Sequence, residues 1–460
     1  LRDFINKYIQ YGDDKETLYM IENGKIRPSK SLQDALSSML NGNEEFIMID
    51  DQKIVYETAL DMARKSYEDG NKRVLVVKGG PGTGKSVLAI NILVRLTNEN
   101  MVCSYVTKNA APRNVYATKL SGDFKKTRIN NLFKGSGSFV ESAENEFDVL
   151  IVDEAHRLNA KSGMFQNLGE NQIKEIIKAS KFSIFFIDES QKVTLKDIGS
   201  IEEIQKYIRN VNAESKLMEL ESQFRCNGSD GYIAWLDDVL DIRKTANNDG
   251  FDLDYDIRIC NTPNEVRNLI FEKNKIKNKA RLLAGYCWNW IADGKNKSNV
   301  YDITIPEYNF AMSWNLGNSQ TWAIDSESVN EIGCIHTAQG LEFDYVGVII
   351  GDDLRYEKNQ IITDVTKRAK TDQSTKGIKT MNIKNPEKAQ KIADKIIKNT
   401  YRTLMTRGQK GCYIYCTNKN LSNYLKGINY EKVGKYEEAF NIFQNDSSDF
   451  SLSKLVIYQY

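Results

Sequence analysis

Several signals that mark a specialised class of protein are missing from this 460-residue sequence. Lys+Arg (63) nearly balances Asp+Glu (62), so any nucleic-acid surface is expected to be a local patch. No apolar run approaches the length of a membrane span, and no secretory signal is visible in the given residues. The seven cysteines are scattered, and the closest pair, Cys412 and Cys416, has no second pair at zinc-ligand spacing. Such cysteines, lying in apolar segments, indicate reduced core thiols and a cytoplasmic protein.

The strongest signal that is present is a strand, a glycine-rich loop and a helix in succession, over residues 74–96. Its loop matches G-x-x-x-x-G-K-[ST] at residues 79–86. Glycines let the backbone wrap closely around a phosphate, so that its N–H groups and the following helix N-terminus point at the anion. Lys85 can then reach the β/γ-phosphates, and the Ser86 hydroxyl can ligate Mg²⁺. The pattern predicts an ATP and Mg²⁺ site that includes Gly79, Gly82, Gly84, Lys85 and Ser86.

Two further apolar strands end in polar residues with matching chemistry. The run 147–152 ends in Asp153-Glu-Ala-His156, where Asp153 can hold the Mg²⁺ water shell and Glu154 can deprotonate an attacking water. The run 182–187 ends in a D-x-x-Q sequence, whose Gln191 can sense the γ-phosphate. Upstream, Gln52 opens a helical pattern. It has the position of an adenine-reading amide, or else it is a solvent-facing helix start.

The alternation of strands and helices predicts an α/β fold with parallel sheets covered on both faces. Ligands of such sheets bind at the carboxyl ends of the strands, where the candidate residues of this half fall. The second half repeats the pattern without a P-loop. We expect a small α+β appendage over 1–44, α/β domains over 45–215 and 216–425, and a tail over 426–460.

The second half contains three motifs and two segments with open interpretations. Phe224-Arg225 is an aromatic–arginine pair, residues 333–344 precede a buried strand, and Arg407 precedes another strand. The sequence has two histidines, His156 and His336, and both fall inside motifs, which favours functional roles. Trp288 and Trp290 either pack in the core or stack on bases. Residues 367–398, with ten Lys/Arg and three Asp/Glu, form either a phosphate-tracking surface or a solvated helical face.

Taken in order, these motifs resemble the core of a superfamily 1 DNA/RNA helicase. The amino-acid sequence is most similar to the Schlafen-type DNA/RNA helicase domain and its bacterial relatives over residues 223–230, 284–288 and 336–351. The matching segments are Gln52, 79–86, 107–113, 153–156, 188–191, 223–225, 336–344 and 406–408. DEAH at 153–156 alone would suggest the other large helicase superfamily, but that superfamily follows it with a Ser-Ala-Thr tripeptide, and here D-x-x-Q follows. The resemblance implies two RecA-like P-loop NTPase domains that hydrolyse ATP between them.

The resemblance also implies a role for each matching residue. Glu154 is the expected base, Gln191 the γ-phosphate sensor, and Arg225 and Arg407 the arginine fingers. Phe224 is expected to stack on adenine, and Glu342 to contact the nucleotide sugar or to couple the motor to the strand. The expected contacts to the nucleic-acid backbone are Thr107, Lys108, His336 and Thr337.

The implied function is an ATP-dependent translocase or helicase on single-stranded DNA or RNA. The sequence departs from the usual pattern of this helicase family in two places. Thr-Arg-Gly stands at 406–408 where the family usually has Thr-Arg-Ala. The short spacing between Arg113 and Asp153 leaves little room for a large accessory domain. One alternative is an ATP-gated module that controls a nuclease, and another is a non-hydrolysing binder, against which Lys85, Asp153 and Glu154 argue. A start at Leu1 fits a longer chain, and some bacterial relatives carry a nuclease ahead of the motor.

Overall fold

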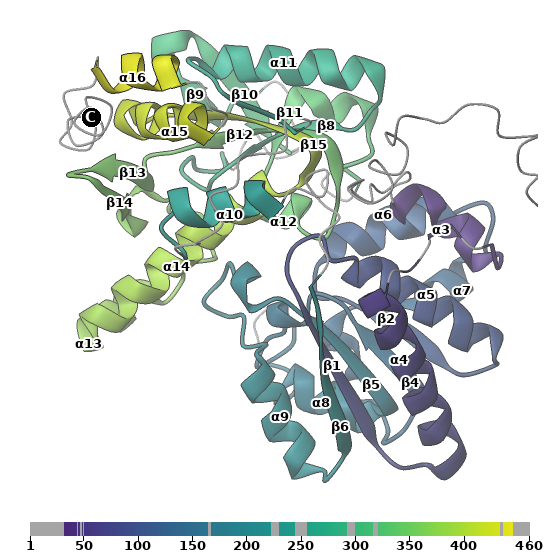
Figure 1. Ribbon diagram of the computed structural model, residues 1–460. Helices are drawn as coiled ribbons and strands as arrows, with labels where there is room; N and C mark the ends of the chain where they lie inside the picture. Colours follow the sequence, from purple (N-terminus) through teal and green to yellow (C-terminus); the bar gives the residue numbers. More distant parts are fainter. Residues whose placement is uncertain are drawn as a thin grey trace, which may run out of the picture.

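The computed structural model describes residues 32–43, 45–46, 48, 50–163, 167–221, 230–243, 255–291, 300–315, 321–432 and 436–444. These residues form two lobes, each built on a β-sheet with helices packed against it (Figure 1). Both sheets are mainly parallel. The predicted α/β class with two RecA-like domains is therefore confirmed.

The first lobe is a six-stranded parallel sheet in the order β3-β2-β4-β5-β1-β6. Its strands are β1 (Arg73–Gly79), β2 (Cys103–Val106), β3 (Phe133–Lys134), β4 (Phe147–Val152), β5 (Ser180–Ile187) and β6 (Glu214–Leu220). Its helices are α3 (Leu32–Leu40), α4 (Asp50–Asp69), α5 (Lys85–Asn98), α6 (Ala110–Leu120), α7 (Lys126–Leu132), α8 (Gln172–Ala179) and α9 (Ile201–Asn210). The 3₁₀ turns are η1 (Ser136–Phe139), η2 (Ala155–Arg157) and η3 (Glu189–Gln191).

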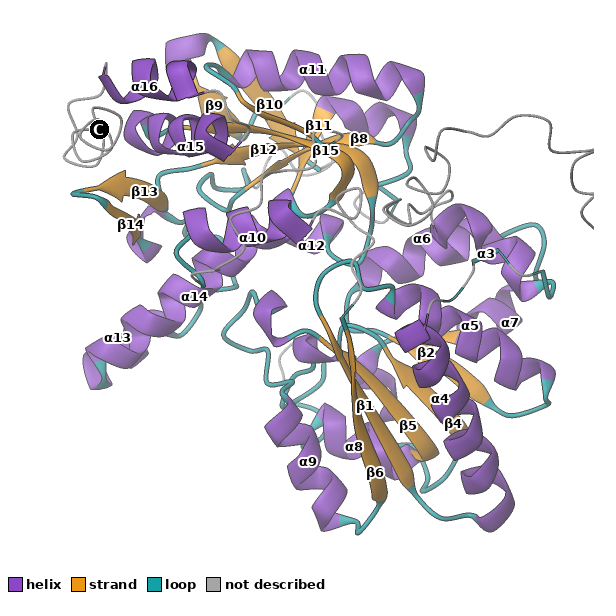
Figure 2. Ribbon diagram, viewed as in Figure 1, coloured by secondary structure: helices purple, strands orange, loops and turns teal. Residues whose placement is uncertain are grey.

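Burial on both faces explains the apolar runs in the first-lobe strands β1, β4 and β5. In β1, Leu75 and Val77 belong to the cluster that contains the buried faces of α4 and α5. Val74 and Val76, which point the other way, belong to a second cluster with α8 and α9. Successive strand residues point to opposite faces, so a strand covered by helices on both sides needs apolar residues at every position. Figure 2 shows these helices on either side of the sheet.

The second lobe is a seven-stranded sheet in the order β7-β15-β12-β8-β11-β10-β9, parallel except for the β9–β10 pair. Its strands are β7 (Asp256–Ile259), β8 (Ala280–Ala284), β9 (Ile303–Ile305), β10 (Phe310–Trp314), β11 (Glu331–Gly333), β12 (Phe343–Ile350) and β15 (Gly408–Cys416), beside a hairpin of β13 (Leu354–Glu357) and β14 (Gln360–Thr363). Its helices are α10 (Asp230–Val239), α11 (Pro263–Ile276), α12 (Ile335–Ala338), α13 (Ile378–Lys384), α14 (Pro386–Met405), α15 (Lys419–Lys432) and α16 (Tyr436–Gln444). The 3₁₀ turns are η6 (Pro306–Tyr308), η7 (Ser326–Asn330) and η8 (Val365–Lys367).

Two of the expected domain boundaries fall inside elements of this fold. The boundary at 215 cuts β6, which pairs with β1 through Leu220 and so belongs to the first sheet. The boundary at 425 falls inside α15, which packs against β15 and β13 of the second lobe. The reason is the same in both places, because pairing and packing continue past the last recognisable motif. Of the expected appendage, only α3 and a few residues after it lie within the described ranges.

The described tryptophans at 288 and 290 and the described cysteines pack within the protein. The Trp290 ring stacks on Trp314 at 5.7 Å between centroids, and the Trp288 indole N–H donates to the Thr304 carbonyl at 3.3 Å. Five of the cysteines are buried, Cys287 is half-buried, all six are free thiols, and Cys226 lies outside the described residues. No helix in the described ranges combines the length and the apolar character needed to cross a bilayer.

Candidate active site

The glycine-rich loop follows β1, which lies between β5 and β6 in the first sheet, and leads directly into α5. Gly82 and Gly84 have φ angles of 82° and 81°, in the left-handed region that favours glycine. Gly84 is also the N-cap of α5, so the loop delivers the chain to a helix N-terminus. The backbone therefore has the conformation and the place of an anion-binding loop.

Two side chains close over this loop. The Lys85 ammonium is buried and donates to the carbonyl oxygens of Gly79 at 2.8 Å and Gly80 at 2.6 Å. The Gln52 side-chain amide, on the first turns of α4, donates to the Thr83 carbonyl at 3.0 Å. Gln52 therefore lies against the loop, and the alternative of a solvent-facing helix start is wrong because its side chain is 7% exposed.

Ser86 and Asp153 meet beside the loop. The Ser86 hydroxyl donates to Asp153 Oδ2 at 2.5 Å, and the Tyr105 hydroxyl donates to the same oxygen at 2.6 Å. Burial and the neighbouring Glu154 raise the pKa of Asp153, and the two hydroxyl hydrogen bonds partly oppose that rise. A hydroxyl and a carboxylate at a helix N-terminus are the oxygen ligands that Mg²⁺ prefers, so these residues fit the cation.

Glu154 is held as a carboxylate by its surroundings. Burial alone would raise its pKa, but His156, Arg407 and Lys85 outweigh burial and hold it below the ordinary value. The Asp188 backbone N–H donates to His156 Nδ1 at 3.3 Å, which places the imidazole proton on Nε2, 2.9 Å from Glu154 Oε2.

The backbone at Glu154 is also unusual. Its φ of 54° is left-handed, which costs a residue with a side chain about 1–3 kcal/mol. The strain directs this carboxylate away from the course of β4 and toward the histidine. Both features suit a group that must stay ionised and point at a fixed place.

Gln191 and Arg407 join the two lobes. The Gln191 amide donates to Asp188 Oδ2 at 2.7 Å, and its Oε1 accepts from Arg407 Nη2 at 2.8 Å. Arg407 is fully buried and is fixed further by the Thr403 carbonyl, 3.1 Å from its Nε. Gln191 of the first lobe and Arg407 of the second lobe, which were predicted from different halves of the sequence, are therefore in direct contact.

Gln339 lies inside the motif 336–344, but no role is predicted for it from the sequence. This fully buried second-lobe residue accepts a hydrogen bond from Arg157 Nη1 of the first lobe. Its amide nitrogen lies 3.4 Å from the Gln191 carbonyl and 3.3 Å from His156 Nε2. Its own carbonyl accepts from Asn109 Nδ2 at 2.6 Å. Gln339 therefore contacts three motif-bearing segments of the opposite lobe, and only its place inside residues 336–344 could have signalled it.

Some of the residues expected to contact nucleic acid form hydrogen bonds or ion pairs with other residues of the protein. Lys108 donates to Asn159 Oδ1 at 2.7 Å and pairs with Asp197 at 3.2 Å. Burial lowers the pKa of Lys108 to about 8, with repulsion from Arg157 adding to the effect and Asp197 opposing it. Thr107 is buried, and its hydroxyl has no partner among the described residues.

The remaining expected residues lie at the start of the second-lobe elements. Thr337 is buried, and its hydroxyl exchanges hydrogen bonds of 2.9 Å with the backbone of Cys334, which caps α12. His336 is half-buried beside the Tyr286 ring, and Glu342 accepts from Gln409 Nε2 at 2.7 Å. Phe224 and Arg225 lie outside the described residues, so their roles stay predictions.

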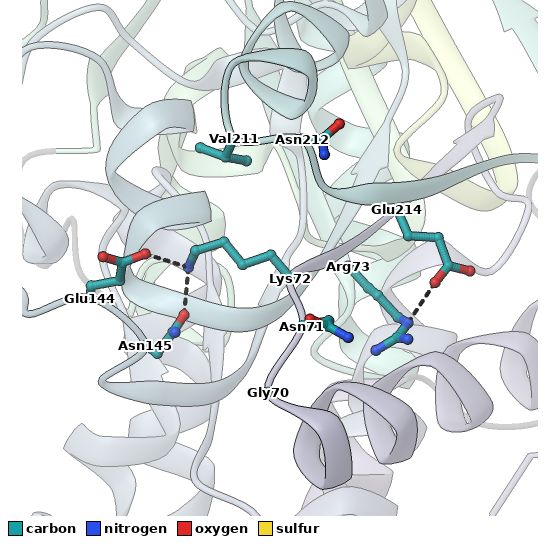
Figure 3. Close-up of a pocket in the computed structure, with 9 residues that line it drawn as sticks. All are labelled: Gly70, Asn71, Lys72, Arg73, Glu144, Asn145, Val211, Asn212 and Glu214. Carbon is teal, nitrogen blue, oxygen red and sulfur yellow. Dashed lines mark hydrogen bonds and ion pairs between the residues drawn. The ribbon is translucent and has the colours of Figure 1, made fainter.

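A separate pocket of about 630 Å³ lies at the opposite, amino edge of the first sheet (Figure 3). The Lys72 ammonium in it donates to the carbonyls of Ile177 at 3.1 Å and Ser180 at 2.9 Å, and Arg73 pairs with Glu214 at 2.8 Å. Its cations are already bound by protein oxygens, so the pocket does not offer a second phosphate site. Its lining is Gly70, Asn71, Lys72, Arg73, Glu144, Asn145, Val211, Asn212 and Glu214.

Three comparisons with known proteins bear on this site. A family model described as "Schlafen group 3, DNA/RNA helicase domain" matches residues 72–418. An uncharacterized protein of Saccharomyces cerevisiae, YPL245W, is 24% identical over 388 residues, which cover 76% of this chain and 83% of that one. Among solved structures, the DEAD-box helicase Mss116 bound to ssRNA and UDP-BeF is similar over 95% of this chain and 84% of its own, with 14% identity and a TM-score of 0.37. That last likeness is too distant to carry an argument.

Proposed function

The chain belongs to the Schlafen group 3 DNA/RNA helicase family, and from this premise we propose that it is an ATP-driven motor on single-stranded DNA or RNA. In this proposal ATP binds between the lobes, and its hydrolysis opens and closes them. The observation that carries the proposal is the contact of Arg407 with Gln191 at 2.8 Å, beside the P-loop and the two carboxylates. A nucleotide site whose cations come from both lobes can convert hydrolysis into lobe movement.

In this proposal the first lobe binds ATP and Mg²⁺. The amides of residues 79–84 and the Lys85 ammonium neutralise the phosphates, and Lys85 exchanges its two carbonyl partners for phosphate oxygens. Gln52, already against the loop at Thr83, reads the adenine edge. Ser86 and Asp153 would hold Mg²⁺, which supplies positive charge next to the phosphate oxygens when it is bound.

The proton chemistry falls to Glu154. The ionised carboxylate accepts a proton from the attacking water and orients it toward the γ-phosphorus. The His156 Nε2–H group, 2.9 Å from Glu154 Oε2, fixes the direction of the carboxylate. The His156 ring is fixed in turn by the Asp188 backbone N–H, so two residues, His156 and Asp188, position the base.

Arg407 of the second lobe stabilises the negative charge that develops on the phosphate oxygens in the transition state. Arg407 offers a planar set of donors that one point charge cannot match, and Gln191 links it to Asp188. We assign Arg225 a parallel role and Phe224 the stacking of adenine. Glu342 would contact the nucleotide sugar or couple the motor to the strand. Thr107, Lys108, His336 and Thr337 would contact the nucleic-acid backbone once the lobes move.

The test is steady-state ATP hydrolysis with and without single-stranded DNA and RNA. We expect hydrolysis that either strand stimulates, and its abolition in Lys85→Ala, which lacks the main phosphate cation. Hydrolysis that no strand changes would favour the ATP-gated module that controls a nuclease. Activity that Lys85→Ala retains would contradict the site itself.

A further inference from the structure

A helical arm extends from the second lobe. We use the name lysine arm for residues 376–398, which comprise α13 and the first part of α14. In Figure 1 α13 lies at the far end of α14, away from the second sheet. The arm is held at its base by a small apolar cluster of Ile378, Ala389 and Ala393, against which Leu195 of the first lobe packs.

Within the part of the chain that the structure describes, the exposed lysines of the arm are not neutralised by acidic side chains. Six of its seven lysines are exposed, and none of the six has an ion pair among the residues that the structure describes: Lys376, Lys379, Lys384, Lys388, Lys391 and Lys395. The seventh, Lys398, is buried and forms ion pairs with Asp241 at 3.3 Å and with Asp394 at 3.2 Å. Glu387 is the one exposed acid of the arm, so a strong positive excess faces solvent.

We propose that the lysine arm is a docking surface for the phosphodiester backbone of nucleic acid, an inference that rests on the proposed motor function. The chain as a whole is nearly neutral, with 63 basic and 62 acidic residues, so this surplus of cations is local. Unpaired lysines on one surface fit a polyanion, because each phosphate that they neutralise releases a condensed counterion.

The helical spacing of these lysines suits a repeating anion. Lys388, Lys391 and Lys395 recur at three and four residues, on the face of α14 opposite Ala389 and Ala393. At 1.5 Å rise per residue, neighbouring lysines stand roughly 4.5–6 Å apart along the helix, comparable with the spacing of phosphates along a strand. The contacts are to backbone charge, so no base preference follows.

The position of the arm links docking to the candidate active site. The same helix α14 continues to Asn399, whose amide donates to the Lys192 carbonyl at 2.9 Å, and to Arg402, whose Nη1 donates to Ser190 Oγ at 3.2 Å. Arg407 follows directly after the helix. A helix of twenty residues, about 30 Å long, thus runs from the lysines to the loop that carries Gln191.

The test compares Lys388→Gln/Lys391→Gln/Lys395→Gln with the parent chain by fluorescence anisotropy across a salt series. The probes are a labelled single strand and the same strand with a duplex at one end. We expect at least about tenfold weaker binding at low salt, and a salt slope that is shallower by about two, from three lost phosphate contacts at ~0.7 each. Loss with both probes assigns the arm to the single strand, and loss with the duplex-bearing probe alone assigns it to the flanking duplex.

The matched control is Lys178→Gln/Lys216→Gln/Lys277→Gln, which removes three exposed lysines from other elements. This control should bind as the parent does, and both triple variants should keep the parent's melting temperature. Equal salt slopes in the arm variant and the control would overturn the docking surface while leaving the motor function intact. A parent chain that binds neither probe would overturn the proposed function, and the docking surface with it.

Discussion

The two lobes have the same kind of sheet but use opposite edges of it. In the first lobe the functional side chains follow the strands, with Lys85 after β1, Glu154 after β4 and Gln191 after β5. In the second lobe Gln339 precedes β12 and Arg407 precedes β15. The carboxyl edge of one sheet therefore meets the amino edge of the other. This arrangement explains why the usual rule for locating ligands at strand ends finds the first half of the site and misses Gln339.

The described carboxyl edge of the second sheet differs from the glycine-rich loop of the first lobe. There Gly285 and Gly351 follow β8 and β12, and a Cβ on Gly285 would stand 2.1 Å from the Tyr401 hydroxyl. That hydroxyl also accepts from the Gly351 backbone N–H at 3.1 Å and donates to Asp353. The Tyr401 side chain therefore fills the space beside these two glycines. In the proposed function the first lobe binds the nucleotide and the second lobe adds the positive charge of Arg407.

The largest expected effect concerns the base of the first lobe. Glu154→Gln keeps the shape and the Asp153 neighbour but cannot accept a proton, so turnover should fall by about 10³ while ATP still binds. Steady-state hydrolysis with fluorescent-nucleotide binding measures both quantities. Glu141→Gln, at an exposed position of the same lobe, is the control and should be unaffected. Near-normal turnover in Glu154→Gln would remove this residue from the chemistry.

A smaller effect is expected at the contact between the lobes. Gln339→Ala leaves the buried Arg157 without its amide partner, and a hydrogen bond to a charged group contributes about 1.5–3 kcal/mol. Strand-stimulated hydrolysis should fall about tenfold, with nucleotide binding to the first lobe little changed. Gln360→Ala, an exposed second-lobe residue, should behave as the parent does. Equal rates in the two variants would mean that Gln339 does not hold the lobes together.

The smallest expected effect is a pH dependence of stability. Burial first, and then repulsion from Arg157 and Lys108 of the first lobe, lower the pKa of His336 to about 3 from the ordinary 6.5. The folded state therefore disfavours protonation, so the contribution to stability is complete above pH 6.5 and is lost as the pH falls toward 3.

Denaturant unfolding at two pH values measures this contribution. Between pH 7 and pH 5.5 the loss should be about 1 kcal/mol in the parent chain and absent in His336→Asn. An identical pH dependence in the two proteins would mean that His336 does not stand against the first-lobe cations in solution.

How much the sequence predicts depends on how local each feature is. The P-loop is fixed by consecutive residues, because a strand, positive-φ glycines and a helix start are neighbours in the chain, and the structure has them where they were predicted. The hydrogen bond between Gln339 and Arg157 joins residues far apart in sequence, and no local pattern encodes it.

The two expected domain boundaries that fall inside β6 and α15 have a related explanation. The edge strand β6 is mostly exposed and lacks the apolar run that marks β1 and β5, so its pairing with β1 could not be predicted. The lysine-rich segment was ambiguous in sequence, since the same composition fits a solvated face. Only the structure separates the six exposed lysines of residues 376–398 from the buried and paired Lys398.

The central claim is that a site built by the first lobe is completed by the second, and Arg407 tests it most directly. The measurement is steady-state ATP hydrolysis at saturating single strand for the parent, Arg407→Ala and Arg407→Lys, with nucleotide affinity and melting temperature alongside. In the proposed function Arg407 meets charge that develops in the transition state. Arg407→Ala should therefore lose at least about a hundredfold in turnover and keep its nucleotide affinity within several-fold. Arg407→Lys should recover little, because a point charge lacks the planar fork. An Arg407→Ala protein that melts much lower yet keeps its turnover would contradict the claim.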